Sequence, residues 1–247
     1  MRSLKMLALV LPLTLCGCLL TTGQISIDFD LGTVTVTNPD NLVYGSLAGF
    51  GLSTLGMEQA RKVGRYLGPR PLVAIWSSPL ERDLRTAEEI AARSSVPVRV
   101  DPSLTEWALM DRWRGQRWTD LSTAFPRELE AYLATPAELS FAPESLNDMA
   151  ERVAAVCRRL DAEHPHGDVA VVSHQDPIQA ARLRLTGSPL SGLHEYKPAH
   201  GTVVTLRPGD SWMEETVWTP GDTPGFGDKA ELRAVGDAPR PTPPNSA

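Results

Sequence analysis

Two junctions in the sequence join an apolar run to a polar side chain that can bind an anion. The run from Leu72 to Ser78 leads into the helical pattern of SSPLERDLRTAEEIA, which carries Arg82, and the run DVAVVS ends directly before His174. A strand that passes into a helix presents the backbone amides of the helix N-terminus, and an arginine there adds a planar fork of donors. The pattern predicts a phosphate-binding site.

Each of these residues also has a structural interpretation. Arg82 could instead pair with Glu81 or Glu89 on a solvated helix face, where an ion pair contributes little. A lone histidine such as His174 is often a hydrogen-bonded structural residue. Taken one at a time, the two residues leave both interpretations open.

Alternating strands and helices must position these side chains. Apolar runs bounded by proline or polar residues predict buried strands, and apolar residues at three- and four-residue spacing predict helices. This alternation specifies an α/β fold, a three-layer α/β/α sandwich with a mostly parallel central sheet, whose ligand crevice lies beyond the carboxyl ends of the strands. The expected elements are a helix after the N-cap Ser53, a strand at 72–78, a helix at 79–93, a strand at 96–100, an irregular excursion at 106–141, a helix at 144–165, a strand at 168–174, a helix at 176–187 and closing strands at 201–206 and 212–218.

Five segments carry a resemblance to a known family. They occur in the order LSTLGMEQA, SSPLERDLRTAE, LTEW, ESLNDMAERV and VAVVSHQDPI, within a match that runs from Asn38 to about Trp218. Together they resemble the histidine phosphatase superfamily, the phosphoglycerate mutase-like enzymes. By this resemblance Arg82 corresponds to the phosphate-binding arginine, His174 to the second active-site histidine and Glu106 to the proton donor.

The resemblance implies phosphomonoester hydrolysis through a phosphohistidine. A histidine at the end of the first strand attacks phosphorus, while two arginines and the second histidine hold the phosphoryl oxygens. A carboxylic acid protonates the departing alkoxide. The scheme needs no metal and no other cofactor, and the expected partner is a small phosphorylated substrate or inorganic phosphate. A phosphatase is favoured over a mutase, because no clear equivalent of the elements that clamp a phosphoglycerate is found.

The nucleophile of this scheme is missing from the sequence as written. An R-H-G motif should follow the first strand and precede Asn38, but its positions fall on Gly32, Thr33 and Val34. An unactivated hydroxyl is a poor nucleophile, so the written chain is expected to be weak or inactive. One explanation is a degenerate member, a pseudoenzyme that still binds phosphate.

The other explanation is a reading-frame error upstream of about Val36. Arg-His-Gly encoded as CGG-CAC-GGT, read one base later, becomes GGC-ACG-GTG, which encodes Gly-Thr-Val, the residues found at 32–34. Such a frameshift would make the N-terminal residues out-of-frame sequence and the native product a cytoplasmic phosphatase.

Residues 1–23 are typical of a signal peptide, with a basic start, an apolar run and small residues around Cys18. The segment from Leu15 to Cys18 resembles a bacterial lipobox, so a genuine leader predicts an exported lipoprotein anchored to the membrane through a lipidated Cys18. The apolar run is short and contains Pro12, which disfavours a spanning helix. The phosphatase-like domain is then expected at 24–218, followed by a disordered tail at 219–247 rich in Pro and Gly.

The composition narrows the function further. The chain has 247 residues, enough for one sizeable α/β domain, and a formal net charge of -6, so that nucleic acid is not an expected partner. Its cysteines have no metal-ligand spacing and support no disulfide framework, and Cys157 is expected to be buried. His194 and His200 are interpreted as structural or exposed.

The stretch EWALMDRWRGQRW allows two interpretations. As a lid over the crevice it would pack Trp107, Trp113 and Trp118 inward, and its arginines would select an acidic substrate. As a partner-binding surface it would expose them. The lid is the favoured interpretation.

Overall fold

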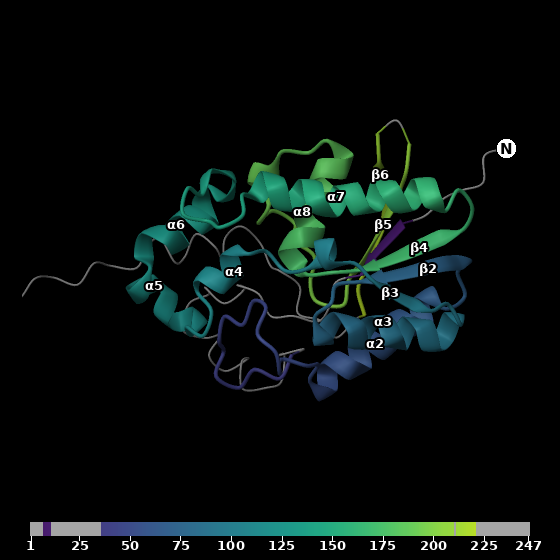
Figure 1. The fold of residues 1–247 in the computed structure, drawn as a ribbon, viewed down its shortest axis with the longest axis horizontal. Helices are drawn as coiled ribbons and strands as arrows, with labels where there is room; N and C mark the ends of the chain where they lie inside the picture. The colour runs from purple at the N-terminus through teal and green to yellow at the C-terminus, as the bar shows by residue number, and fades with distance from the viewer. Residues whose placement is uncertain (1–6, 11–35, 210, 221–247) are drawn as a thin grey trace, which may run out of the picture.

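The chain folds around one six-stranded sheet, in the order β3-β2-β4-β1-β5-β6 (Figure 1). The structure is a computed structural model and describes residues 7–10, 36–209 and 211–220. Strands β3, β2, β4 and β1 run parallel, and β5 and β6 are antiparallel to their neighbours. The strands are β1 (Leu7–Val10), β2 (Leu72–Ser77), β3 (Val98–Val100), β4 (Asp168–Val172), β5 (Val203–Arg207) and β6 (Met213–Trp218).

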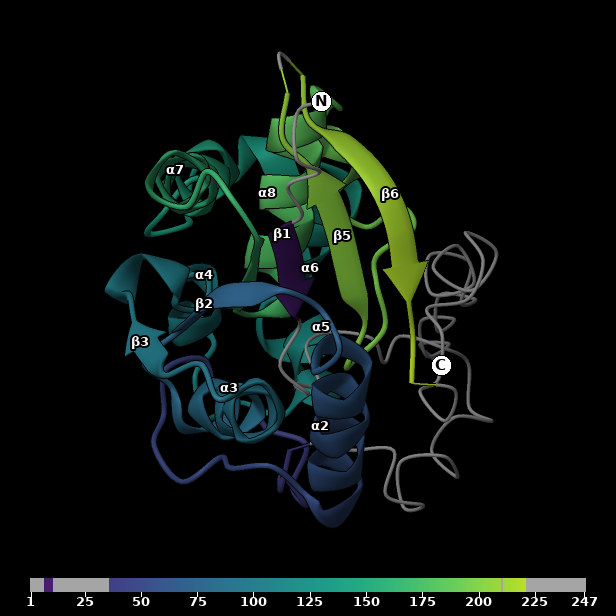
Figure 2. The same cartoon turned by 90° about the vertical axis from the view of Figure 1, so that its right-hand side faces the viewer.

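Helices cover both faces of the sheet, which confirms the predicted three-layer α/β/α sandwich (Figure 2). The helices are α2 (Thr54–Leu67), α3 (Glu81–Ser94), α4 (Leu109–Arg112), α5 (Leu121–Ala124), α6 (Pro126–Ala134), α7 (Leu146–Glu163) and α8 (Gln175–Thr186), with 3-10 turns η1 (Pro102–Leu104), η2 (Trp118–Asp120), η3 (Pro136–Glu138) and η4 (Leu190–Gly192). In the described part of the chain no helix is both long and apolar enough to cross a membrane.

Helices α2 and α3 pack together on one face of the sheet. The Ser53 side chain accepts a hydrogen bond from the Gly56 amide at 3.1 Å, as predicted for the N-cap of α2. The two helices approach closely at Gly64, where a Cβ atom would lie 2.4 Å from the Glu89 carbonyl oxygen. Valine, leucine and isoleucine side chains between these helices and β2 form one core cluster.

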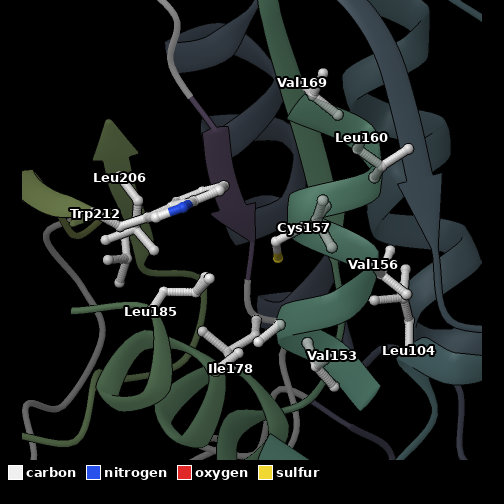
Figure 3. Packing of buried hydrophobic residues seen from close by; sticks show 14 of the residues in the cluster. Leu104, Val153, Val156, Cys157, Leu160, Val169, Ile178, Leu185, Leu206 and Trp212 are labelled. Atoms are coloured by element: carbon white, nitrogen blue, oxygen red, sulfur yellow. The ribbon is translucent and has the colours of Figure 1, made fainter. Parts of the chain in front are cut away.

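Helices α7 and α8 cover the other face, and their apolar side chains form a second core cluster with β4 and β5 (Figure 3). Cys157 lies inside this cluster with no exposed surface, as expected from the sequence. Burial raises the pKa of its thiol to about 12, so Cys157 is an unreactive core residue. Cys16 and Cys18 lie outside the described residues.

Helices α4, α5 and α6 form a separate group at one end of the sheet (Figure 1). Trp107, Trp113 and Trp118 are buried there in a third apolar cluster with Tyr132. The indoles point into the protein, as the lid interpretation predicts. Each of these large rings buries a large apolar area in the cluster.

The position of strand β1 is the main difference between the predicted and the observed fold. The sequence analysis assigns Leu7–Val10 to the leader, whereas the structure places this strand between β4 and β5, in register with both. The first strand was expected directly before Gly32, but residues 11–35 lie outside the described part of the chain. Residues 221–247, most of the predicted tail, also lie outside it.

Candidate active site

The site lies where two neighbouring parallel strands end. Ser77 of β2 is in register with Val172 of β4, and the Ser78 amide continues the pairing by donating to the Val172 carbonyl at 2.9 Å. This register brings Ser78 beside His174, and the Ser78 Oγ lies 2.8 Å from the His174 Nε2. The two junctions recognised in the sequence therefore meet at one point.

Arg82 reaches the same point from the first turn of α3. Its Nη2 lies 3.1 Å from the His174 Nδ1 and donates to the Gly45 carbonyl at 3.0 Å. The guanidinium also stacks on the Tyr44 ring, with 4.9 Å between the Cζ and the ring centroid, in cation-π geometry. Arg82 is held in place by two segments that are far apart in the sequence.

The Gly45 carbonyl is aimed at Arg82 by a backbone conformation that favours glycine. Gly45 has a φ of +44°, and a Cβ there would lie 2.5 Å from the Asp111 carboxylate. The Ser46 amide and hydroxyl both donate to the same carboxylate, at 2.9 and 2.8 Å. Contacts to the α4 region thus fix the loop that carries this carbonyl.

The alternative partners considered for Arg82 are not the ones found. Glu89 pairs with Arg61 at 3.6 Å. The carboxylates nearest to Arg82 are Asp83, 3.8 Å from its Nε, and Glu106, 3.8 Å from its Nη2. Arg82 is only 1% exposed, which rules out the solvated-face interpretation.

Glu106 completes the cluster from the loop after η1. Its Oε2 lies 3.5 Å from the His174 Nδ1, and its Oε1 accepts a hydrogen bond from the Trp107 amide at 2.9 Å. Desolvation raises the pKa of this carboxyl to about 7, although the Arg82 charge opposes the shift. A carboxyl group that is still about half protonated at neutral pH is suited to proton donation.

Arg152 of α7 holds the loop that carries Glu106, a role that the sequence did not reveal. Its guanidinium donates to the carbonyls of Ser103, Thr105 and Glu106 at 2.8 to 3.0 Å. The same guanidinium forms a two-point ion pair with Glu144. These contacts fix the backbone on which Glu106 is presented, because several rigid donors act on one short loop.

Ser78 and Asp83 are further site residues that sequence reasoning missed. Asp83 lies one position after Arg82, yet its carboxylate is fully buried and its Oδ2 is 3.3 Å from the His174 Nε2. An acid in the first turn of a helix is usually explained by the helix dipole, so no sequence pattern places Asp83 beside the histidine.

The remaining histidines do not join the site. The His194 Nε2 is paired with the Tyr132 carbonyl at 2.8 Å, in agreement with a structural role, and His200 is buried. Among the described residues no group of three or more His, Cys, Asp or Glu side chains is arranged to hold a metal ion.

Comparisons with known proteins give the family. The model of the histidine phosphatase superfamily (branch 1) matches residues 34–219. An uncharacterized protein of Mycobacterium tuberculosis (strain ATCC 25618 / H37Rv) is 37% identical over 167 residues, which are 63% of this chain and 76% of that protein. The glucosyl-3-phosphoglycerate phosphatase of the same strain is 32% identical over 182 residues, 69% of this chain and 76% of the relative.

Solved structures agree on the fold. The native structure of a mycobacterial glucosyl-3-phosphoglycerate phosphatase has a TM-score of 0.69 at 23% identity, over 87% of this chain and 98% of that chain. A putative α-ribazole-5'-P phosphatase of Escherichia coli has a TM-score of 0.67 at 20% identity, over 88% of this chain and 98% of that chain. With the family model matching most of its length, the chain belongs to the histidine phosphatase superfamily.

Proposed function

We propose that the pocket at Arg82, His174 and Glu106 binds the phosphate group of a small phosphomonoester, or inorganic phosphate. The observation that carries this proposal is the convergence of the three side chains. Arg82 and Glu106 approach the same atom, His174 Nδ1, at 3.1 and 3.5 Å. A buried guanidinium beside an imidazole and a protonated carboxyl matches the charge of a phosphate monoester and of its leaving oxygen.

Each residue has a distinct task in this proposal. The Arg82 guanidinium offers two parallel donors to phosphate oxygens, and a bound phosphate replaces the Gly45 carbonyl as its acceptor. His174 donates to a third oxygen from Nδ1. Glu106 gives its proton to the leaving oxygen, which would otherwise depart as a strongly basic alkoxide. Phosphatases among the relatives support this class of ligand.

Turnover by the written chain is proposed to be weak or absent. The positions that correspond to the nucleophilic histidine and its arginine are Thr33 and Gly32, and the family match starts only at residue 34. Without the histidine no phosphohistidine forms, and a threonine hydroxyl without an adjacent base does not replace it. The ancestral activity is phosphomonoester hydrolysis, and this chain retains mainly the residues that bind phosphate.

Two origins of this loss are distinguished at the gene. A reading-frame error predicts that resequencing the codons for residues 31–38 restores Arg-His-Gly, and the native product is then a cytoplasmic phosphatase. An intact frame establishes a true loss of the nucleophile.

A non-catalytic binding module is the second candidate, favoured by the absent nucleophile. Its lipoprotein form requires cleavage before Cys18, which would remove Leu7–Val10 from the middle of the sheet. The position of β1 therefore favours a binding protein that keeps its N-terminal residues over one anchored through Cys18.

Binding and turnover by the purified full chain test the proposal. Inorganic phosphate binding is measured by calorimetry, and hydrolysis of an aryl phosphate by absorbance. Binding is expected to be lost in Arg82→Ala and His174→Ala and kept in the control Glu88→Gln, whose side chain is exposed on α3. Equal phosphate affinity of the wild type and Arg82→Ala would refute the site.

A further inference from the structure

Asp83 occupies an unusual position behind the histidine of the proposed phosphate site. It is fully buried, and its Oδ2 lies 3.3 Å from the His174 Nε2, on the side of the ring opposite to Arg82 and Glu106. We infer that Asp83 is a positioning residue that holds the Nε2 proton of His174 and lets this histidine bind phosphate as an imidazolium. The inference rests on the proposed function of the same pocket.

The carboxyl group of Asp83 is only weakly hydrogen-bonded. The Ser78 side chain and the Asp83 backbone amide interact with this carboxyl, but among the described residues neither carboxylate oxygen has a partner of standard hydrogen-bond geometry. Its nearest charged neighbours are the Arg82 Nε at 3.8 Å and His174. A buried carboxyl group with such weak hydrogen bonds is costly, and its closest ionisable neighbour is the His174 ring.

The contacts of His174 define its tautomer. A guanidinium can only donate, so the Arg82 Nη2 at 3.1 Å makes Nδ1 the acceptor. The proton of the neutral ring is then on Nε2, which faces the Ser78 hydroxyl at 2.8 Å and the Asp83 carboxyl at 3.3 Å. His174 is consequently not the base of Ser78, and Ser78 is not an activated nucleophile.

Burial favours the neutral form of both members of the Asp83–His174 pair. Desolvation raises the pKa of Asp83 well above its usual range, with the Arg82 charge opposing it, and desolvation lowers the pKa of His174 well below its usual range. The other titratable groups that act on this pair are Glu106 and, from α7, Arg152. With Asp83 and His174 in their neutral forms, Arg82 is the cation of the pocket.

Phosphate binding is expected to move a proton from Asp83 to His174. The phosphate charge occupies the Nδ1 side of the ring and takes Arg82 as its partner, so that Nδ1 is free to bind a proton and donate it to a phosphate oxygen. The Asp83 carboxyl loses one proton and His174 gains one, so the protein exchanges no net proton with solvent. The resulting Asp83 carboxylate and His174 imidazolium form a charge-assisted pair.

A purely structural role of Asp83 predicts a different result for Asp83→Asn than a positioning role does. If the carboxyl only fills space in the first turn of α3, its neutral isostere serves equally well, and Asp83→Asn binds phosphate as the wild type does. If Asp83 supplies the charge that balances an imidazolium, Asp83→Asn folds normally but His174 cannot become charged near neutral pH. The matched control is Glu88→Gln on the exposed face of the same helix.

The test combines calorimetry of inorganic phosphate with nitrogen-15 NMR of the His174 ring across pH. The wild-type ring is expected to be the Nε2–H tautomer when free and doubly protonated with phosphate bound. Asp83→Asn is expected to bind phosphate about 10- to 100-fold more weakly, the worth of a hydrogen bond to a charged group, with a ring that stays neutral at pH 7. Asp83→Ala, with the carboxyl removed, is expected to shift the free-ring nitrogen signals.

The outcomes separate this inference from the proposed function. Failure of the wild type to bind phosphate defeats the proposed function, and the free-ring spectra then still report on the Asp83 contact. Wild-type binding that is matched in affinity and ring protonation by Asp83→Asn overturns the inference alone. Ring nitrogen signals that are the same in Asp83→Ala and in the wild type also overturn it.

Discussion

The Arg82 guanidinium and the His174 ring lie 3.1 Å apart although 92 positions separate them in the chain. Both residues follow the carboxyl end of a buried parallel strand, and β2 and β4 are direct neighbours in the sheet. The contact is a consequence of topology, because neighbouring parallel strands deliver the helices that follow them to the same edge. A single anion at this edge is within reach of both side chains.

Glu106→Gln is expected to change the pH dependence of stability. A buried acid whose pKa rises from 4.5 to about 7 stabilises the fold relatively less as pH increases, since the folded state holds a proton that the unfolded state releases. The wild type should lose up to about 3 kcal/mol of unfolding free energy between pH 4 and pH 8 from this group, by the usual 1.36 kcal/mol per pKa unit.

Urea denaturation at pH 4 and pH 8 measures this effect. The difference in unfolding free energy between Glu106→Gln and the wild type at pH 4 reports the substitution itself. At pH 8 this difference should shift in favour of the variant. Glu88→Gln, on an exposed surface, serves as the control. If the difference in unfolding free energy between wild type and variant is the same at both pH values, the pKa of Glu106 is not raised.

Arg152→Ala is expected to weaken both the fold and the site. The substitution leaves the carbonyls of Ser103, Thr105 and Glu106 without their donor and breaks the pair with Glu144. Removing one partner from such a network costs about 3 to 5 kcal/mol when the remaining charge is buried, and less here because the pair is partly exposed. The melting temperature should fall by several degrees.

Arg158→Ala is the matched control for Arg152, because Arg158 lies on the same helix and pairs with Glu151 at the surface. Its effect on the melting temperature should be small. If the two variants melt alike, the assignment of Arg152 as the residue that holds the Glu106 loop is wrong.

Gly64→Ala is expected to destabilise the protein. Inside a helix, Gly→Ala usually raises the free energy of unfolding by about 0.5 to 1 kcal/mol. Here a Cβ would lie 2.4 Å from the Glu89 carbonyl oxygen, and this backbone atom cannot move away as a flexible side chain would. A loss of about 1 to 3 kcal/mol, the range for overpacking, is predicted. Chemical denaturation measures it, with Gly192→Ala as the control, since its nearest neighbour lies 3.9 Å away.

The layers of the fold were predictable because their periodic patterns are strong. The runs at 72–78 and 168–174 became β2 and β4, and Ser53 is the N-cap of α2. Residue types at the strand ends were likewise enough to bring Arg82 and His174 together. These inferences succeed because a buried parallel strand leaves the sequence few alternatives.

The supporting contacts were not predictable in the same way. Asp83 and Arg152 follow ordinary helical patterns, and only the tertiary packing shows that one lies behind His174 and the other under the Glu106 loop. The Gly45 carbonyl at Arg82 depends on a backbone φ that no sequence pattern specifies. Periodicity reports which face of a helix is buried, and it does not report which loop packs against that face.

Deletion of residues 1–17 tests whether the N-terminal run is a leader or part of the domain. Strand β1 bonds to β4 on one side and to β5 on the other, in register over Leu7–Val10. Its removal leaves two central strands with unpaired backbone groups in the sheet interior, where each such group costs about 1 to 3 kcal/mol. The truncated chain should therefore be insoluble or unfolded by circular dichroism. Deletion of residues 1–5, which stops short of β1, should fold as the full chain does, and the same melting curve for both truncations would show that the sheet does not need this strand.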